Sequence, residues 1–375
     1  MKLGHYKIDI WILIPALVLI FFSLALVYSA SSDYALQKWN DSSYLFKQHL
    51  IRVVIALVVL FVIAKFDYRY LQDVSKLGIF IAVLLLIYVL VTSSSVKNVN
   101  RWINLGFLSF QPSDFAKFAL IIHLANLLVR KEDYLDKLYK GYLPLIGYIL
   151  LICGLVAAQP NFSTSVIIFS ASLSMILLSR VKFKHVIVTI ISIIPLAVLF
   201  VLSKSYIISR IESYAEYSST GTAKHQLTQA IIGLGNGGFL GVGPGNSVQK
   251  EFFLPESYGD FIFSIVGEEY GFIGTLLIIS MFVLILCRGL RVSKKIEDPF
   301  GKYLSFGITI ILVTYAVVNM SVATGIFPTT GVPIPFVSFG GTAIFLNSAA
   351  IGILLNISSQ VNNNQVNSAD EGGSL

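Results

Sequence analysis

Ten long runs of apolar residues, separated by short polar segments, organise this sequence. Each run is continuous rather than alternating with polar residues, which is typical of membrane-spanning helices and not of an outer-membrane β-barrel. The sequence therefore predicts an all-α polytopic membrane protein with about ten transmembrane helices. We expect the spans at residues 10–29, 48–64, 77–92, 113–129, 142–158, 162–179, 186–202, 260–287, 303–323 and 341–358.

The composition excludes other classes of protein. Of the 375 residues, 55% are apolar and 13% are charged, whereas a soluble domain has roughly 25% charged residues. So few charges could not cover a soluble surface, and the apolar content is too high for a disordered chain. The two cysteines and five histidines show neither a disulfide framework nor a metal-ligand spacing.

The basic residues predict the orientation in the membrane. If the N-terminus lies inside, 17 of the 27 Lys and Arg residues fall in short inner segments. The positive-inside rule then places both termini in the cytoplasm and leaves 203–259 as a long extracytoplasmic loop between spans 7 and 8. The net charge of +7 is explained in this way, without nucleic acid. We take 1–360 as one integral membrane domain and 361–375 as a disordered cytoplasmic tail.

A first polar cluster at the outer ends of the spans runs from Asn100 to Lys117. Pro112 suits a helix start, and Asp114 and Lys117 are neighbours on one helical face. One interpretation is an ion pair that anchors the helix end. The other is a basic pocket for a phosphate, with Arg101 as a bidentate donor and Lys117 as a point charge, because ionisable groups inside spans are usually functional.

A second cluster extends from Gly233 to Asp260. Its GLGNGG sequence matches G-x-G-x-x-G, but no strand precedes it and the segment is predicted outside, so we reject a dinucleotide site. Seven glycines within 233–245 indicate either a flexible linker or backbone packed close to a ligand. Beyond the cluster, Gly267 and Gly271 form a GxxxG motif, which predicts close helix packing.

Acidic residues follow this glycine-rich segment. Asp260 is expected at a helix start, either as a simple N-cap or as a functional carboxylate at the membrane surface. Glu268 and Glu269 lie about 12 Å deeper by helical rise. Acids at that depth need partners, and Arg101 and Lys117 are the candidates.

A third cluster, from Pro328 to Thr342, carries the sequence TGVPIPFVSFGGT. Irregular backbone at membrane depth persists only where it is buried in protein or lines a cavity. We expect this segment to form a wall of the same outer cavity, with Ser338 and Thr342 as polar lining. The alternative is a packed re-entrant turn without ligand contact.

Together, the three blocks resemble the SEDS family (shape, elongation, division and sporulation) of the RodA, FtsW and SpoVE type. The similarity runs from about residue 10 to 359, and GVGPGNSVQK is closer to the FtsW cell-division branch than to RodA. The segments that carry the resemblance are RWINLGFLSFQPSDFAK, GNGGFLGVGPGNSVQKEFFLPESYGDFIFSIVGEEYGFIG and TGVPIPFVSFGG.

The chain departs from the family pattern at three places. Asp114 replaces a usual Glu, which keeps the carboxylate. Asn161 stands where an Asp is common, so no role is carried over to it. Tyr258 and Gly259 replace the His and Thr that precede the family's Asp, so the carboxylate of Asp260 is retained with different neighbours.

The resemblance implies a peptidoglycan glycosyltransferase of the bacterial inner (cytoplasmic) membrane that polymerises lipid II on the outer face for septal wall synthesis. A sugar hydroxyl attacks an anomeric carbon while a polyprenyl diphosphate leaves, so the reaction needs a general base and cations. Asp260 is the predicted base, and Arg101 and Lys117 are the predicted cations, oriented by the other acids. The predicted substrate-binding residues are Arg101, Lys117, Asp114, Glu268, Glu269 and Ser338.

The family also implies partners. These are lipid II itself, a class B penicillin-binding protein with transpeptidase activity, and other membrane proteins of the division complex. No nucleic acid and no bound organic cofactor are expected. A divalent cation, Mg²⁺ or Mn²⁺, at the diphosphate is an open option, because no ligand pattern in the sequence specifies it.

Two other functions remain open at this point. A lipid II flippase or other transporter would also use ten spans, a charged cavity and broken helices, although the acids lie near the outer surface and no inverted repeat is visible. A non-catalytic scaffold of the division complex explains the helices but not the intramembrane acids.

The orientation can be tested by labelling single cysteines in a variant that lacks Cys153 and Cys287. Cysteines introduced at Ser219 and Asn363 should react on opposite sides of the membrane with an impermeant thiol reagent. Labelling from the same side would contradict the predicted topology.

Overall fold

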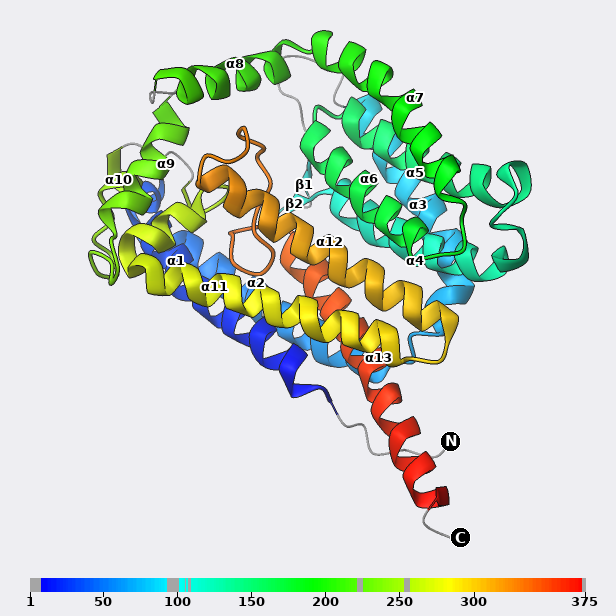
Figure 1. Cartoon of the computed structure of the whole chain (residues 1–375). Helices are drawn as coiled ribbons and strands as arrows, with labels where there is room; N and C mark the ends of the chain where they lie inside the picture. Colours follow the sequence, from blue (N-terminus) through cyan, green and yellow to red (C-terminus); the bar gives the residue numbers. More distant parts are fainter. Residues whose placement is uncertain are drawn as a thin grey trace.

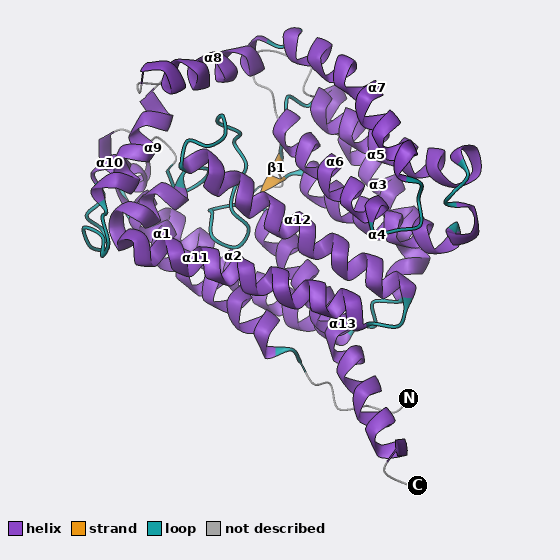
Figure 2. Cartoon of the chain, viewed as in Figure 1, coloured by secondary structure: helices purple, strands orange, loops and turns teal. Residues whose placement is uncertain are grey.

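The computed structural model is helical almost throughout (Figures 1 and 2). It describes residues 8–92, 101–104, 106, 109–220, 225–252 and 257–372, with the backbone alone described at 217–220, 225, 251–252 and 362–372. A 3₁₀ turn (Glu132–Tyr134) and a π-helical turn (Leu138–Tyr142) precede α5 (Leu143–Ala158), and β1 (Ile103–Asn104) pairs antiparallel with β2 (Ser109–Phe110). The elements are α1 (Ile10–Trp39), α2 (Tyr44–Lys65), α3 (Tyr70–Thr92), β1 (Ile103–Asn104), β2 (Ser109–Phe110), α4 (Pro112–Arg130), α5 (Leu143–Ala158), α6 (Phe162–Leu177), α7 (Phe183–Leu202), α8 (Ser205–Thr220), α9 (His225–Asn236), α10 (Val248–Phe252), α11 (Ile262–Lys295), α12 (Pro299–Ala323) and α13 (Ala343–Gly372).

The predicted fold class is confirmed, because the ten apolar runs all fall in helices. Nine helices in the described part of the chain are long and apolar enough to cross a membrane, and α6 is a shorter apolar helix. The count of ten crossings stays a prediction. The first helix continues beyond its apolar run to Trp39 and ends at Asn40, whose left-handed backbone (φ 54°) is a common way to terminate a helix.

The turns predicted to face the cytoplasm gather at one end of the bundle, which we call the inner end. Arg288 pairs with Asp9, the N-cap of α1, at 2.7 Å. The Tyr68 hydroxyl donates to Asp298 at 2.9 Å, and the Tyr68 N–H donates to the Asn356 side chain at 3.0 Å. These contacts tie α1 to α11, and the α2–α3 turn to both the α11–α12 turn and α13.

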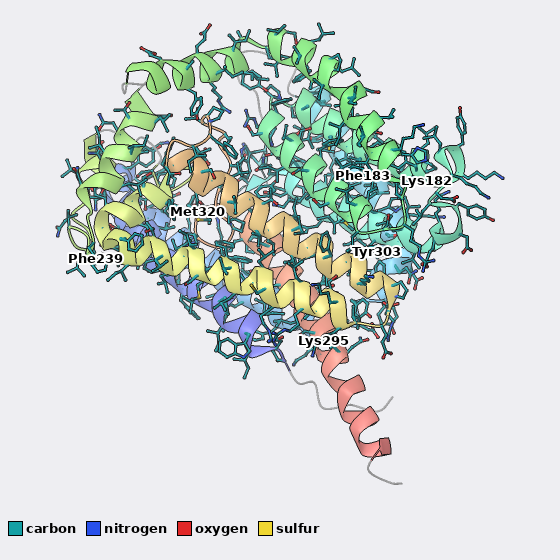
Figure 3. The ribbon with its side chains drawn as sticks, in the orientation of Figure 1. Lys182, Phe183, Phe239, Lys295, Tyr303 and Met320 are labelled. Carbon is teal, nitrogen blue, oxygen red and sulfur yellow. The ribbon has the colours of Figure 1, made fainter. Side chains whose placement is uncertain are left out.

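Side chains of predicted inner and outer segments lie at opposite ends of the molecule. In Figure 3, Lys182 and Lys295 lie toward the same end, whereas Phe239, from the long predicted outer loop, lies at the other end. We call this second end the outer end. The long loop contains α8, which bridges from α7 to α9 (Figure 1).

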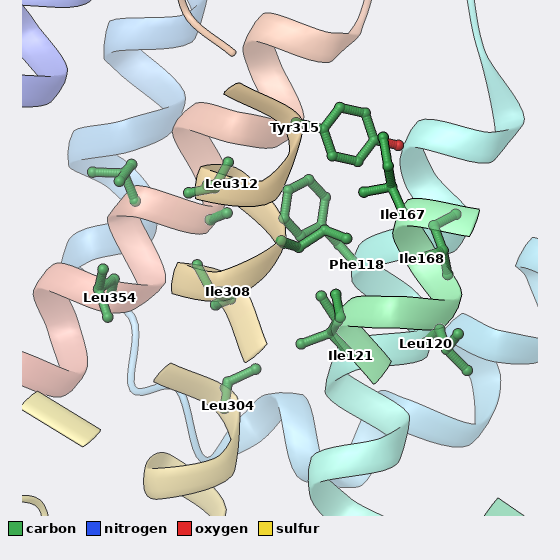
Figure 4. Close-up of a cluster of buried hydrophobic side chains, with 14 of the residues drawn as sticks. Phe118, Leu120, Ile121, Ile167, Ile168, Leu304, Ile308, Leu312, Tyr315 and Leu354 are labelled. Atoms are coloured by element: carbon green, nitrogen blue, oxygen red, sulfur yellow. The ribbon is translucent and has the colours of Figure 1, made fainter. Parts of the chain in front are cut away.

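The core lies where α4, α6, α12 and α13 meet (Figure 4). Phe118 of α4, Ile167 of α6, Ile308 of α12 and Leu354 of α13 are all buried there. In the most apolar 18-residue stretch of α4, 83% of the residues are buried, whereas only 6% are buried in the corresponding stretch of α7. The cavity described below is therefore built on the central helices, while α7 lies at the periphery.

Helix α11 is broken at Gly271, whose backbone (φ 62°, ψ −157°) is not helical. The glycine-rich segment 237–243 supplies the backbone hydrogen bonds that the break removes. The N–H groups of Val242 and Gly243 donate to the carbonyls of Glu268 and Glu269 at 2.9 and 3.0 Å. In return, the Phe272 N–H donates to the carbonyl of Gly238 at 2.9 Å. Backbone at membrane depth is thus satisfied within the protein, as it must be.

This arrangement decides between the two interpretations of the glycine-rich segment. A Cβ on Gly237 would lie 1.8 Å from the carbonyl oxygen of Gly267, so only glycine permits this approach. The segment is packed backbone rather than a flexible linker, and its neighbour is α11 rather than a ligand. The close packing predicted at Gly267 and Gly271 is present: a Cβ on Gly267 would lie 2.3 Å from the Leu234 side chain of α9, and one on Gly271 would lie 2.4 Å from the Gly241 N–H of this segment.

The C-terminal end differs from the expectation. The sequence predicts a disordered tail from residue 361, whereas the structure continues α13 as a helix to Gly372. The division of the chain into one membrane domain and a separate tail stays a prediction.

The close approach predicts that Gly237→Ala lowers stability by about 1–3 kcal/mol, because the methyl group would force the two backbones apart. Gly235→Ala is the matched control, since a Cβ there meets nothing within 4 Å. The unfolding temperature of the purified protein in detergent measures both. Equal unfolding temperatures for the two variants would contradict the packing.

Candidate functional site

The three polar clusters meet at the outer end around a cavity of about 420 Å³. The segment before α4, the turn before α11 and the irregular segment before α13 each supply part of its wall. This confirms that the Pro328 to Thr342 segment lines the outer cavity. The lining residues include Arg101, Gln111, Asp114, Tyr258, Asp260, Gly331, Pro333 and Phe339.

Asp260 lies on the cavity wall, in a turn two residues before α11 begins at Ile262. The N-cap of α11 is Phe261, and no side chain makes a cap hydrogen bond there. The N-cap interpretation of Asp260 is therefore wrong. The carbonyl of Asp260 accepts a hydrogen bond from the Asn319 side chain at 2.7 Å, and the Tyr258 carbonyl accepts from the Phe339 N–H at 2.9 Å. The turn is thus fastened to α12 and to the third cluster.

Positive charge surrounds Asp260. Arg101 lines the same cavity, and burial lowers the pKa of its guanidinium from the ordinary value. The neighbouring charge of Arg210 lowers the pKa of Arg101 further, whereas Asp260 raises it. The three charged side chains therefore lie within electrostatic reach of one another, two cations and one anion.

Asp114 and Lys117 form a buried ion pair at 2.9 Å, with side chains 8% and 3% exposed. The Lys117 ammonium also lies 4.2 Å from the ring centre of Tyr315. Asp114 and Tyr315 line the cavity, whereas Lys117 is not among its lining residues. The geometry therefore has the predicted ion pair, and Lys117 reaches the cavity only through its partner carboxylate.

Glu268 and Glu269 lie away from the cavity lining, and their partners differ from the expected Arg101 and Lys117. The Glu268 carboxylate accepts hydrogen bonds from the Ser247 hydroxyl and from the N–H of Val248 at 3.2 Å, at the start of α10. Glu269 pairs with Lys250 at 3.3 Å. The expected pairing was wrong because Lys250, in the long outer loop, reaches inward to α11.

Ser338 is buried and supports the wall of the cavity from behind. Its hydroxyl accepts a hydrogen bond from the Ile334 N–H at 2.9 Å, which closes a tight turn. Thr342 accepts from the Gln111 N–H at 3.2 Å, which links the third cluster to the first. Neither side chain is among the lining residues of the cavity.

Two arginines of the site are missing from the sequence-based prediction. Arg52 lines the cavity from α2, donates to the Gly340 carbonyl at 3.4 Å and lies 4.6 Å from the ring centre of Phe339. Its signal was present, because it is a charge inside an apolar run, as Lys117 is. Arg210 lies on α8, in a loop for which the sequence predicted no elements.

The donor groups of the cavity do not fit a divalent cation held by the protein alone. Among the described residues, no group of three or more His, Cys, Asp or Glu side chains is placed to hold a metal ion. The cavity offers the carboxylates of Asp114 and Asp260, and Arg52, Arg101 and Arg210 lie at or beside it. Residues 254–256 of the glycine-rich block, the Leu-Pro-Glu motif, lie outside the described residues.

Comparison with known proteins agrees with the three sequence blocks. A family model for FtsW, RodA and SpoVE, described as a cell cycle protein, matches residues 10–363. The chain belongs to this family. Within the SEDS family it falls in the FtsW branch, and its own apolar helices make it a multi-pass membrane protein.

Its relatives cover nearly the whole chain. A protein from Trichlorobacter lovleyi named probable peptidoglycan glycosyltransferase FtsW is 35% identical, over 95% of this chain and 94% of its own length. The stage V sporulation protein E of Bacillus subtilis is also 35% identical, over 93% and 96%.

Solved structures share the fold of this SEDS protein. RodA from Thermus thermophilus matches with a TM-score of 0.70 at 21% identity, over 94% of this chain and 97% of that one. A chain from a peptidoglycan synthase complex, described for its coordination of polymerization and crosslinking, matches with a TM-score of 0.76 at 20% identity, over 95% and 98%. The RodA-like fold is thereby established.

The buried Asp114–Lys117 pair makes a prediction about stability. Lys117→Met or Asp114→Asn alone should destabilise the protein by about 3–5 kcal/mol, because one buried charge loses its partner. The double variant should recover much of that loss. Lys47→Met is the control, since its pair with Asp41 is exposed (63% and 40%) and should contribute less than about 1 kcal/mol. Additive losses in the unfolding temperature of the double variant would contradict the coupling.

Proposed function

We propose that this protein is a peptidoglycan glycosyltransferase that polymerises lipid II into glycan strands on the outer face of the cytoplasmic membrane. Family membership and the names of the FtsW relatives support this activity. The observation that carries the proposal is the position of Asp260. Its carboxylate faces a cavity at the outer end of the bundle, with Arg101 on the same wall.

Glycosyl transfer needs a general base and, close to it, a cation that stabilises the negative charge of the leaving group. In the proposed reaction, Asp260 takes the proton from a sugar hydroxyl as that oxygen forms a bond to the anomeric carbon of the second substrate. The bond from that carbon to the diphosphate breaks, and its electron pair leaves with the polyprenyl diphosphate. The guanidinium of Arg101 stabilises the charge that develops on the leaving group.

The remaining predicted residues act on the shape and charge of the cavity. Asp114 lies on the wall, and Lys117 balances its charge from behind. Glu268 and Glu269 hold the loop segment that contains α10 against α11. Ser338 closes the turn behind the wall. We propose that these last three residues position the site and do not touch the substrate.

The geometry favours a polymerase over a lipid II flippase. The charged cavity lies at the outer end, whereas the inner turns are tied together through Tyr68, Asp298 and Asn356. A flippase needs a polar route between the two ends, while a polymerase needs only the outer cavity. The scaffold alternative does not account for buried charges assembled around a cavity.

We further propose a role in septal wall synthesis together with a class B penicillin-binding protein and other membrane proteins of the division complex. The FtsW relatives support the division role. The related structure that coordinates polymerization with crosslinking supports a transpeptidase partner. The single membrane helix of such a partner needs an apolar face, and α7 offers one, because only 6% of its most apolar window is buried.

Asp260→Asn tests the proposed base directly. The variant keeps the shape and the backbone contacts of the turn but cannot accept a proton, so lipid II polymerisation should fall by roughly 10²–10⁴-fold. Folding and membrane insertion should be unchanged. The measurement is glycan-strand formation from purified lipid II at matched protein concentration, with unfolding temperature recorded in parallel.

Asp41→Asn is the matched control, because Asp41 lies in the α1–α2 turn and pairs with Lys47 outside the cavity. It should polymerise lipid II as the wild type does. Near-normal polymerisation by Asp260→Asn would mean that the base is another group.

A further inference from the structure

Arg210 lies where two hollows next to the catalytic cavity meet. It projects from α8, and its Nη1 donates to the carbonyl of Thr330 at 3.1 Å. On one side it lines a polar hollow of about 370 Å³ that Asp260 also lines. On the other side it lines a groove of about 280 Å³ between α6, α7, α8 and α12. A single guanidinium is therefore shared by a polar and an apolar space.

Arg210 lies close to the proposed base. A Cβ built on Gly331 would be 3.3 Å from the Asp260 carboxylate and 3.7 Å from Arg210 Nη2. The two charged groups are therefore within about 7 Å of each other. Gly331 has a positive φ of 70° and carries no side chain, which leaves the space beside both groups open.

Apart from Arg210, apolar side chains form most of the groove wall. Val166 of α6, Val201 of α7, Ile211 of α8 and Phe327 after α12 contribute to it. Val166, Ile211 and Phe327 are 45–48% exposed in the protein. The apolar lining suits a hydrocarbon tail, and Arg210 lines the same groove.

A pair of guanidiniums beside a polar space is suited to a polyanion. Burial lowers the pKa of the Arg101 guanidinium most, and the nearby charge of Arg210 lowers it further, so a diphosphate between the two guanidiniums would relieve their repulsion. Arginine binds phosphate oxygens through two parallel N–H donors. A ligand that carries both a diphosphate and an isoprenoid chain matches both spaces at once.

We propose that Arg210 and this groove form the binding site of the leaving polyprenyl diphosphate, with the diphosphate between Arg210 and Arg101 and the tail in the groove. The inference rests on the proposed glycosyltransferase function and assigns its leaving group. The sugar end of the same substrate then points toward Asp260, where the bond to the diphosphate breaks. The diphosphate remains on the two arginines after the electron pair has transferred to it.

The experiment measures binding of three probes to the full-length protein in lipid nanodiscs: farnesyl diphosphate, farnesol and inorganic diphosphate. Arg210→Gln is the main variant, because it removes the charge and keeps an N–H donor for the Thr330 carbonyl. Its affinity for farnesyl diphosphate should fall about 10- to 150-fold, the usual range for a lost charged hydrogen bond. Arg210→Lys should recover part of the affinity, because the charge is kept.

Two further variants separate the parts of the site. Lys204→Gln is the charge control, because Lys204 is exposed at the α7–α8 junction and does not line the groove. It should bind all three probes as the wild type does. Ile211→Trp should weaken farnesyl diphosphate and farnesol by filling the groove, while binding of inorganic diphosphate stays unchanged.

Wild-type affinity for farnesyl diphosphate in Arg210→Gln would overturn the proposal, as would the absence of binding to the wild type. If Arg210→Gln is not monodisperse, the Ile211→Trp variant decides: equal losses for farnesyl and inorganic diphosphate would overturn the groove assignment. Lipid II polymerisation is measured on the same samples. The wild type could bind diphosphate through Arg210 and yet fail to polymerise lipid II. That result would contradict the proposed function and would leave the proposed binding site intact.

Discussion

The hydrogen bonds exchanged between segment 237–243 and the broken helix α11 determine where the outer cavity forms. A helix that breaks at membrane depth must find new partners for its freed backbone groups, and no water is there to supply them. The glycine-rich segment supplies them because its backbone approaches α11 more closely than any side chain would allow. The part of α11 before Gly271 is thereby fixed, and the turn that carries Asp260 precedes it directly. The position of the site therefore depends first on these backbone hydrogen bonds and only then on the charged side chains.

Sequence reasoning succeeded where contacts are local and where composition decides. The apolar runs identified the helices, and the three-residue spacing of Asp114 and Lys117 identified an ion pair on one helical face. It failed where partners come from distant segments. Glu269 pairs with Lys250 of the long outer loop, and no spacing rule relates those positions. Arg210 was missed for the same reason, since only the folded path of α8 brings it beside the third cluster.

The charges of this protein divide into two groups with different environments. Inside the bundle, Lys117 and Glu269 each have an opposite charge in contact, which offsets the high cost of burying a charge, whereas Glu268 is held by hydrogen bonds from Ser247 and the Val248 N–H. Those at the outer cavity include three arginines, Arg52, Arg101 and Arg210, grouped around a space that a substrate can enter. Walls of low dielectric strengthen the field of such a group, so the cavity attracts anions before any contact is made.

The contacts at the inner end have a mechanical consequence. Arg288 with Asp9 joins α1 to α11, and Tyr68 with Asp298 and Asn356 joins the α2–α3 turn to the start of α12 and to α13. Helices that are held together at one end can move apart only by tilting about that end. A small tilt there gives the largest displacement at the far end, where the loops are irregular. A change of shape that admits a substrate to the outer cavity would therefore move the wall segments and leave the inner turns in place.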